Sequence, residues 1–270
     1  MNFIYKALAY FKRSFRIELS YRFAFGLGIL SAFINLLIFF FIDKLFGAQL
    51  NPHLANYGVN YFSYVLVSIA TSTFIGTTMG AVASQIQREQ MTGTLEALLG
   101  TNTSIYTLLG LMIGWNLINA LINLLVYLLA ALFLFKINLT NINLISVGVI
   151  LFLVIGSFNA LGIISASFVL IYKRGNPIAW LINLFYELLG GVYFPITVLP
   201  AWLQYLAYLF PVTHAIKAMQ LAVYKNASLE TLWLELLILD IFCLILIPLS
   251  IIIIRYAFNR ARREGTLVQY

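Results

Sequence analysis

Long runs without any charged residue constrain this chain more than any other feature of its sequence. Four such runs are Phe23–Ile42, Tyr57–Ala83, Ser104–Phe135 and Leu144–Tyr172. Each reaches the roughly 20 apolar residues that a helix needs to cross a bilayer. Charged residues make up only 9% of the chain, whereas a soluble domain carries about a quarter. We therefore predict an all-α integral membrane protein without a sizeable soluble domain.

Two further crossings are predicted in the second half of the chain. Ile178–Leu189 has a helical pattern, but glycines and prolines interrupt the run that follows, at Gly190-Gly191, Phe194-Pro195, Pro200 and Phe210-Pro211. Such residues break helices. We expect this helix to break near Gly190 and continue as short re-entrant helices over residues 190–211. Thr231–Ile254 would then be the sixth crossing. Between the first two crossings, Asp43–Asn56 is expected to be a short polar loop.

The first 22 residues have a different pattern. Ile4, Leu8, Phe11, Phe15 and Leu19 share one arc of a helix, and Lys6, Lys12, Arg13 and Arg16 occupy the opposite side. This pattern predicts an amphipathic helix that lies in the headgroup layer. A plain juxtamembrane stretch, with charges that serve topology alone, is the alternative.

The distribution of Lys and Arg predicts the topology. With six crossings and an internal N-terminus, only Lys44, Lys136, Lys217 and Lys225 of the 16 basic residues lie outside. Cytoplasmic loops are enriched in Lys and Arg. We therefore expect both termini in the cytoplasm, and the net charge of +7 needs no nucleic acid as a partner.

Motifs for catalysis are missing from the sequence. No glycine is followed by lysine, which excludes a phosphate-binding loop of the G-x-x-x-x-G-K type, and Cys243 is the single cysteine. His53 and His214 are expected in solvated or interfacial outer segments, so no metal site is predicted. A membrane-embedded enzyme is disfavoured, although distant crossings could still bring catalytic groups together.

The loop over residues 84–101 separates two apolar runs and carries Arg88, Glu89 and Glu96. Thr94 can cap a short helix, Leu95–Leu99, with Glu96 in its first turn. We expect Leu95, Leu98 and Leu99 to give this helix an exposed apolar face. That face would dock a partner, or its leucines would dip back into the bilayer.

Two motifs carry a resemblance to a known family. The segment Arg88–Leu99, REQMTGTLEALL, resembles the E-x-x-x-G-T-L-E-x-L signature in the first cytoplasmic loop of ABC-2 type transporter permeases. The segment GVYFP at residues 191–195, followed by LPAWL at 199–203 and Phe210-Pro211, resembles the second signature of that family. The resemblance covers nearly the whole chain in matching order.

The resemblance implies a single transmembrane permease domain over residues 1–270 in the cell inner or plasma membrane. It implies a second permease subunit, identical or homologous, and two copies of a separate ATPase subunit that bind ATP and Mg, with no cofactor on this chain. The substrate would be an exported amphipathic or hydrophobic drug, lipid or lipid-linked glycan. The residues matched to the ATPase contact of the coupling helix are Arg88, Glu89, Gly93, Thr94, Leu95 and Glu96. Those matched to the outer re-entrant gate are Gly190, Gly191, Phe194, Pro195 and Pro200.

Glu187 and Asp240 are acidic residues inside predicted helices. A charge at a helix centre costs roughly 2.5–3.5 kcal/mol on insertion scales, so such residues usually face a cavity or a partner. Both could line the transport pathway. Alternatively, Glu187 bonds backbone donors freed at the helix break, and Asp240 pairs across a helix interface. An ion-coupled secondary transporter or channel that uses these two carboxylates is the alternative function.

Overall fold

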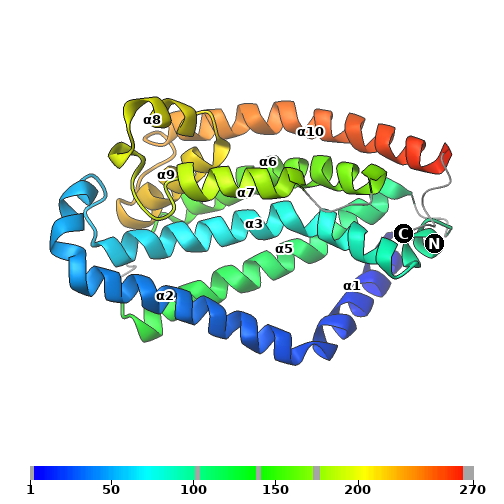
Figure 1. The fold of residues 1–270 in the computed structure, drawn as a ribbon, viewed down its shortest axis with the longest axis horizontal. Coiled ribbons are helices and arrows are strands. Elements are labelled where there is room, and N and C mark those ends of the chain that lie inside the picture. Colours follow the sequence, from blue (N-terminus) through cyan, green and yellow to red (C-terminus); the bar gives the residue numbers. More distant parts are fainter. Residues whose placement is uncertain (1–2, 101–103, 138–140, 173–176, 264–270) are drawn as a thin grey trace.

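The computed structural model describes residues 3–100, 104–137, 141–172 and 177–263, and their regular structure is helical throughout. Five helices are long and apolar enough to cross a membrane, and they run along one common axis (Figure 1). These helices are α2 (Arg22–Leu50), α3 (Tyr61–Met91), α5 (Ile105–Leu129, extended by a π-helical segment Ala130–Leu134), α6 (Leu144–Tyr172) and α10 (Trp233–Arg263). Helix α1 (Phe3–Ser20) precedes them and crosses the bundle axis obliquely.

Helix α3 forms the centre of the bundle, and α2 lies at its flank (Figure 1). In the most apolar 18-residue window of each helix, 72% of the residues are buried in α3 but only 6% in α2. The sequences explain the difference. The buried face of α3 carries small and hydroxyl residues such as Ser68 and Thr71, whereas α2 exposes large apolar side chains such as Leu30 and Phe41.

Side-chain caps begin three of the long helices. Asn60 accepts a hydrogen bond from the backbone N–H of Ser63 at the start of α3, and Ser104 accepts one from Thr107 at the start of α5. Asn143 accepts one from Ser146 in the first turn of α6 (N···O 3.1 Å). Asn and Ser are among the preferred N-cap residues because their side chains satisfy backbone donors that the helix leaves free.

A glycine allows α3 and α6 to approach closely. A Cβ atom on Gly162 would lie 2.5 Å from the carbonyl oxygen of Met79, so no other residue fits without moving a helix. Two glycine pairs, Gly76/Gly80 and Gly110/Gly114, also have a spacing typical of close helix packing. A Cβ atom on Gly76 would lie 2.9 Å from the Tyr186 hydroxyl oxygen, and one on Gly114 would lie 3.2 Å from the Phe11 ring. A Cβ atom on the other glycine of each pair would meet no neighbouring atom within 4 Å.

The helix that begins at Pro177 ends after Leu189, as predicted. Helix α7 (Pro177–Leu189) ends at the glycine pair, and a 3-10 turn (Ile196–Val198), α8 (Ala201–Ala207) and α9 (Pro211–Tyr224) follow. Helices α8 and α9 meet at 90°. Gly191 adopts a φ of +75°, and its carbonyl accepts a hydrogen bond from the Tyr64 hydroxyl (O···O 2.7 Å). This bond fixes the broken segment to the central helix.

The six predicted crossings are confirmed only in part. The described part of the chain has five long spans, and a sixth only if the bent pair α8 and α9 counts as one. The expected fifth crossing contains α7, whose 13 residues span only about 20 Å. The polar loop expected at Asp43–Asn56 begins later than predicted. Helix α2 continues to Leu50, and a 3-10 turn (Asn51–Leu54) follows. The helix thus includes Asp43 and Lys44, and the Lys44 ammonium lies 5.6 Å from the centroid of the Phe40 ring one turn back.

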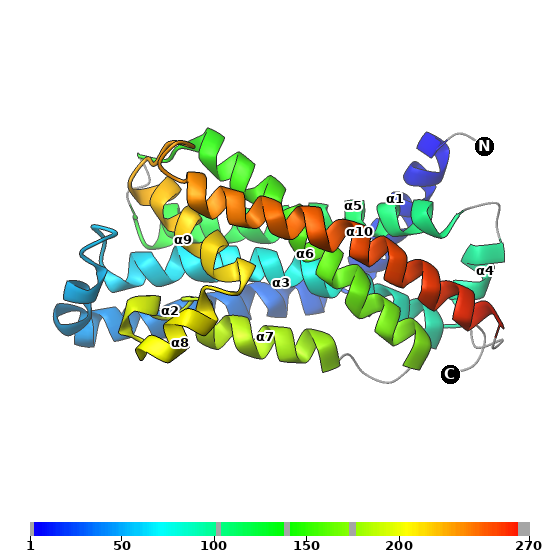
Figure 2. The ribbon, with the colours of Figure 1, turned by 90° about the horizontal axis from the view of Figure 1, so that it is seen from above.

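The bundle has two chemically different ends. The start of α1, helix α4 (Thr94–Gly100) and the end of α10 lie at one end, and α8 lies at the other (Figures 1 and 2). We name the first the basic end, because α1 and the last turns of α3 and α10 carry most of the described arginines, including Arg13, Arg88 and Arg262. The end with α8 is the opposite end.

Candidate functional site

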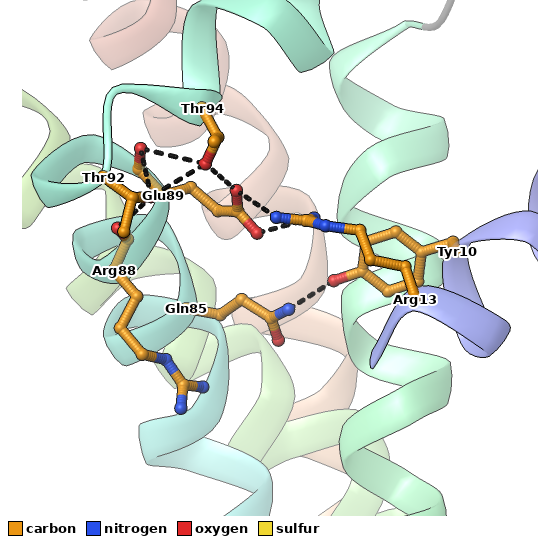
Figure 3. A network of polar contacts seen from close by, with 7 residues as sticks. All are labelled: Tyr10, Arg13, Gln85, Arg88, Glu89, Thr92 and Thr94. Atoms are coloured by element: carbon orange, nitrogen blue, oxygen red, sulfur yellow. Dashed lines mark hydrogen bonds and ion pairs between the residues drawn. The ribbon is translucent and has the colours of Figure 1, made fainter. Parts of the chain in front are cut away.

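Three helices meet at a polar junction at the basic end. Glu89, in the last turns of α3, binds Arg13 of α1 through two contacts, at 2.8 and 2.9 Å. The same carboxylate accepts a hydrogen bond from the hydroxyl of Thr94, at the start of α4 (Figure 3). The Glu89 side chain is 7% exposed, and that of Arg13 is 37% exposed. One buried carboxylate therefore connects α1, α3 and α4, and we call this group, with Tyr10 and Gln85, the α1–α3–α4 junction.

Helix α1 is attached to the bundle by further polar contacts. Gln85 donates a hydrogen bond to the Tyr10 hydroxyl, and Trp115 and Asn119 of α5 both donate to Glu18 (2.9 and 2.7 Å). Burial, with a further contribution from the Glu89 charge, raises the pKa of Tyr10 to about 12. The hydrogen bond to Glu89 raises the pKa of Arg13, so its guanidinium stays charged.

The apolar face of α1 divides into two parts. Phe11, predicted to face lipid, packs instead on Trp115, with ring centroids 5.8 Å apart. The remaining members of the predicted arc are exposed on the subunit surface: Ile4, Leu8, Phe15 and Leu19.

The apolar face predicted for the helix after Thr94 comprises Leu95, Leu98 and Leu99, and its own chain covers the first two, so the predicted exposure is wrong for them. The Leu99 side chain lies outside the described residues. Leu95 is 2% exposed and belongs to a buried cluster with Ile86 and Met112, and Leu98 packs against the same cluster. Gly93 explains the difference, because its φ of +68° reverses the chain and folds α4 back against α3. These buried contacts attach α4 to the bundle.

The residues matched to the ATPase contact separate into inward and outward groups. Glu89 and Leu95 face the subunit interior. Arg88 is exposed and points away from Arg13 and Glu89 (Figure 3), and Gly93 is exposed beside it. Thr94 is half-buried. Glu96 lies within α4, and its side chain is outside the described residues. The exposed rim of the α3–α4 turn therefore consists of Arg88, Met91, Thr92 and Gly93.

A polar cavity of about 290 Å³ lies between α2, α3, α5 and α7. It is lined by Gly28, Ser31, Ala32, Asn35, Ile69, Ser72, Thr73, Tyr127, Tyr186, Glu187, Val192 and Tyr193. Glu187 is the single charged residue in this lining. The expected bonds from Glu187 to backbone donors at the helix break do not occur among the contacts of the described residues. Its carboxylate therefore faces the cavity.

Sequence reasoning missed the wall that α2 contributes. Gly28, Ser31, Ala32 and Asn35 follow i, i+3, i+4 and i+7 spacing, which places them on one helix face. All four line the polar cavity. The detectable signal was a stripe of small and polar residues in an otherwise apolar crossing.

The other predicted site residues lie away from the cavity lining. Asp240 is exposed on α10. Gly190, Gly191 and Pro195 are buried, Phe194 is half-buried and Pro200 is exposed. The glycine pair directly precedes Val192 and Tyr193, which do line the cavity, so these residues shape it indirectly. His214, expected in a solvated or interfacial segment, is instead buried in α9, where its ring contacts the Tyr208 carbonyl (3.0 Å).

Comparison with known proteins identifies the family. A family model described as ABC-2 type transporter matches residues 5–224. The chain belongs to the ABC-2 type transporter family. The match extends from α1 to α9 and so contains both the α1–α3–α4 junction and the polar cavity. None of the curated proteins that were compared matches the chain.

Membership in the ABC-2 type transporter family indicates what this chain does. The membrane domain of this family is the permease component of an ABC transporter and is not itself the ATP-hydrolysing unit. The family implies association with an ABC ATPase component. With its long apolar helices, the chain is a multi-pass membrane protein.

Proposed function

We propose that this chain is the permease subunit of an ATP-driven exporter, with residues 1–270 forming one transmembrane domain. Two copies of a separate ATPase subunit would bind ATP and Mg and dock on the exposed rim of the α3–α4 turn. The observation that carries this proposal is the α1–α3–α4 junction. It places the family's signature loop at the basic end, fixed to the helix that also lines the polar cavity.

The junction offers a path for mechanical coupling. A displacement of α4 by the closing ATPase would be passed to α3 through the buried Leu95 side chain, and to α1 through Thr94, Glu89 and Arg13. Because α3 also contributes Ser72 and Thr73 to the polar cavity, a shift of this helix changes the cavity. The rim supplies the contact, and the buried residues transmit the movement.

The polar cavity supports pairing with a second permease, identical or homologous. Ser31, Asn35 and Glu187 are exposed on the surface of one subunit. Polar side chains are costly in lipid and usually face a bundle interior or a cavity. A second permease against α2 and α7 would cover them and complete a pathway for an amphipathic substrate.

The arrangement of charge supports the membrane orientation. Lys and Arg at the basic end support a cytoplasmic position for that end, because cytoplasmic loops are enriched in these residues. In this orientation both chain ends and the ATPase dock are cytoplasmic, and the re-entrant helices α8 and α9 lie on the outer side of the cell inner or plasma membrane.

Co-purification tests the assignment. The protein is extracted from its native membrane in mild detergent, as wild type and as the variants Arg88→Glu and Glu96→Arg. The matched control is Arg262→Glu, which reverses an exposed arginine of α10 at the same end. We expect an ATPase subunit with wild type and control, and its loss in both loop variants. If wild type brings down no ATPase and transport continues after nucleotide depletion, a gradient-driven transporter replaces this proposal.

A further inference from the structure

The polar cavity has the lining of a site for a positively charged group. Glu187 contributes a carboxylate, Asn35 an amide carbonyl, and Ser31 and Thr73 hydroxyl oxygens. Among the described residues that form the lining, none is Lys, Arg or His. Within the described part of the chain, no basic side chain forms an ion pair with Glu187. A carboxylate in a weakly polar environment is stabilised by a nearby cation, and this cavity supplies none.

Tyrosine rings add to this preference. Tyr127, Tyr186 and Tyr193 all line the polar cavity. Aromatic faces attract organic cations, with tyrosine among the effective rings. A protonated amine can also donate up to three hydrogen bonds, which matches the several oxygen acceptors. An anionic group would be repelled by Glu187 and would find no charged donor in the lining.

An apolar cavity adjoins the polar one. Its volume is about 490 Å³, and it lies between α2 and α5 with its π-helical extension. Ile29, Phe33, Leu36 and Phe133 are among its walls. Ala32 and Tyr127 line both cavities. A polar compartment with one negative charge therefore shares a wall with a larger hydrocarbon compartment, and ligand sites typically measure about 300–1,000 Å³.

We propose that the two cavities bind an amphiphile that carries an amine, with its ammonium head beside Glu187 and its hydrocarbon chain between α2 and α5. As a statement about the exported substrate, this inference rests on the proposed function. The binding itself does not depend on an ATPase. The charge of the head group selects the ligand, because the apolar cavity accepts any alkyl chain.

Photolabelling with matched probes tests this inference. The probes are a twelve-carbon alkylamine with a diazirine near the chain end, and the alcohol and carboxylic acid of the same length and label. The full chain, without ATPase, is reconstituted in nanodiscs of phosphatidylcholine, and labelled residues are mapped by mass spectrometry. We expect the amine to label the walls around Phe33 and Phe133, with protection by excess dodecylamine. The alcohol and the acid should label them at least about tenfold less at equal concentration.

Two carboxylate variants separate charge recognition from general effects. Glu187→Gln keeps the size of the side chain and should lower labelling by the amine at least about tenfold. Asp240→Asn removes an exposed carboxylate outside both cavities and should leave labelling unchanged. A third variant, Ala32→Phe, fills the shared wall and should reduce labelling without any change in charge. Elution as a single species on size exclusion controls for folding.

Equal labelling by all three probes, or full labelling of Glu187→Gln, would overturn the inference, since the apolar cavity would then be an unselective lipid groove. That result leaves the proposed function standing if the ATPase co-purifies. Conversely, amine-selective labelling in a protein that recruits no ATPase supports the site and removes the exporter. The two proposals therefore fail through different measurements.

Discussion

Each end of the bundle holds an ion pair between a half-exposed basic side chain and a buried glutamate, but the two glutamates have different further partners. At the basic end, Glu89 and Arg13 have side chains 7% and 37% exposed. At the opposite end, Glu235 of α10 and Lys217 of α9 are 6% and 38% exposed, with a 2.6 Å contact. Burial and charge are thus nearly equal. The difference lies in the remaining partners, because Glu89 also binds Thr94, whereas Lys217 is the one side-chain partner of Glu235 among the described contacts.

A second pair of residues extends the comparison. Gly93 at the basic end and Gly191 at the opposite end both have positive φ values, of +68° and +75°. A Cβ atom on Gly93 would meet nothing within 4 Å, but on Gly191 it would lie 3.2 Å from Ile196. The opposite end is therefore packed and fixed. At the basic end, Gly93 has open space around it, and Glu89 shares its contacts between Arg13 and Thr94. Such an arrangement is expected of a surface that receives a moving partner.

The largest effect is expected at the opposite end. Lys217→Ala leaves the buried carboxylate of Glu235 without its cation, and removing one partner of a buried ion pair costs about 3 kcal/mol or more. We expect this variant to have the lowest apparent unfolding temperature of the series, measured by thermal unfolding in detergent. The double variant Lys217→Ala/Glu235→Gln should recover much of the loss. A loss in Lys217→Ala no larger than in Arg13→Ala would remove the distinction between the two ends.

The next largest loss of stability is expected from replacing the glycines with positive φ, Gly191 and Gly93. Gly191→Ala forces a side chain into a left-handed conformation against Ile196, which costs about 2 kcal/mol. Gly93→Ala has the same conformational cost but open space around it, so about 1 kcal/mol is expected. Thermal unfolding of both variants measures the difference. Equal losses would show that the packing around Gly191 contributes nothing.

Much of this fold is predictable from the sequence because membrane spans are signalled by composition. Helix α6 has the predicted bounds, Leu144–Tyr172, and the break at Gly190-Gly191 follows from residues that cannot continue a helix. The end of α2 was misjudged, since a polarity change marks where an apolar run stops and not where a helix stops. Helical hydrogen bonds continue through Asp43 and Lys44.

The sites were harder to predict, because they depend on contacts between distant segments. The ion pair of Arg13 and Glu89 joins residues 76 positions apart, and nothing local to either residue indicates it. The interior position of Leu95 depends on the direction that the chain takes after Gly93. Glu187 was recognisable as an unusual charge, but its cavity required the face of α2, where Ser31 and Asn35 lie.

The junction at the basic end predicts a smaller loss of stability with a larger functional consequence. Arg13→Ala removes one partner of Glu89 but leaves Thr94, so the free energy of unfolding should fall by about 1–2 kcal/mol. Because Arg13 links α1 to α3 and, through Glu89, to Thr94 of α4, ATP-driven transport should fall more than stability does. The charge-exchanged variant Arg13→Glu/Glu89→Arg should restore part of both. If transport and stability decline in proportion, the ion pair has a structural role alone.

The smallest effect at neutral pH belongs to Tyr10, and its pH dependence has a defined sign. Tyr10→Phe leaves the amide donor of Gln85 unpaired, which costs about 1 kcal/mol. In the folded protein the pKa of Tyr10 is raised from 10.0 to about 12, so the unfolded chain loses this proton first as pH rises. Wild type therefore loses stability between pH 10 and about 12, by roughly 2–3 kcal/mol, and the variant does not. Chemical unfolding should show wild type to be more stable than Tyr10→Phe at pH 8. At pH 11.5 this difference in the free energy of unfolding should be lost or reversed. The other tyrosines are common to both proteins and cancel in the comparison, so a constant difference would show that Tyr10 is not buried at the junction.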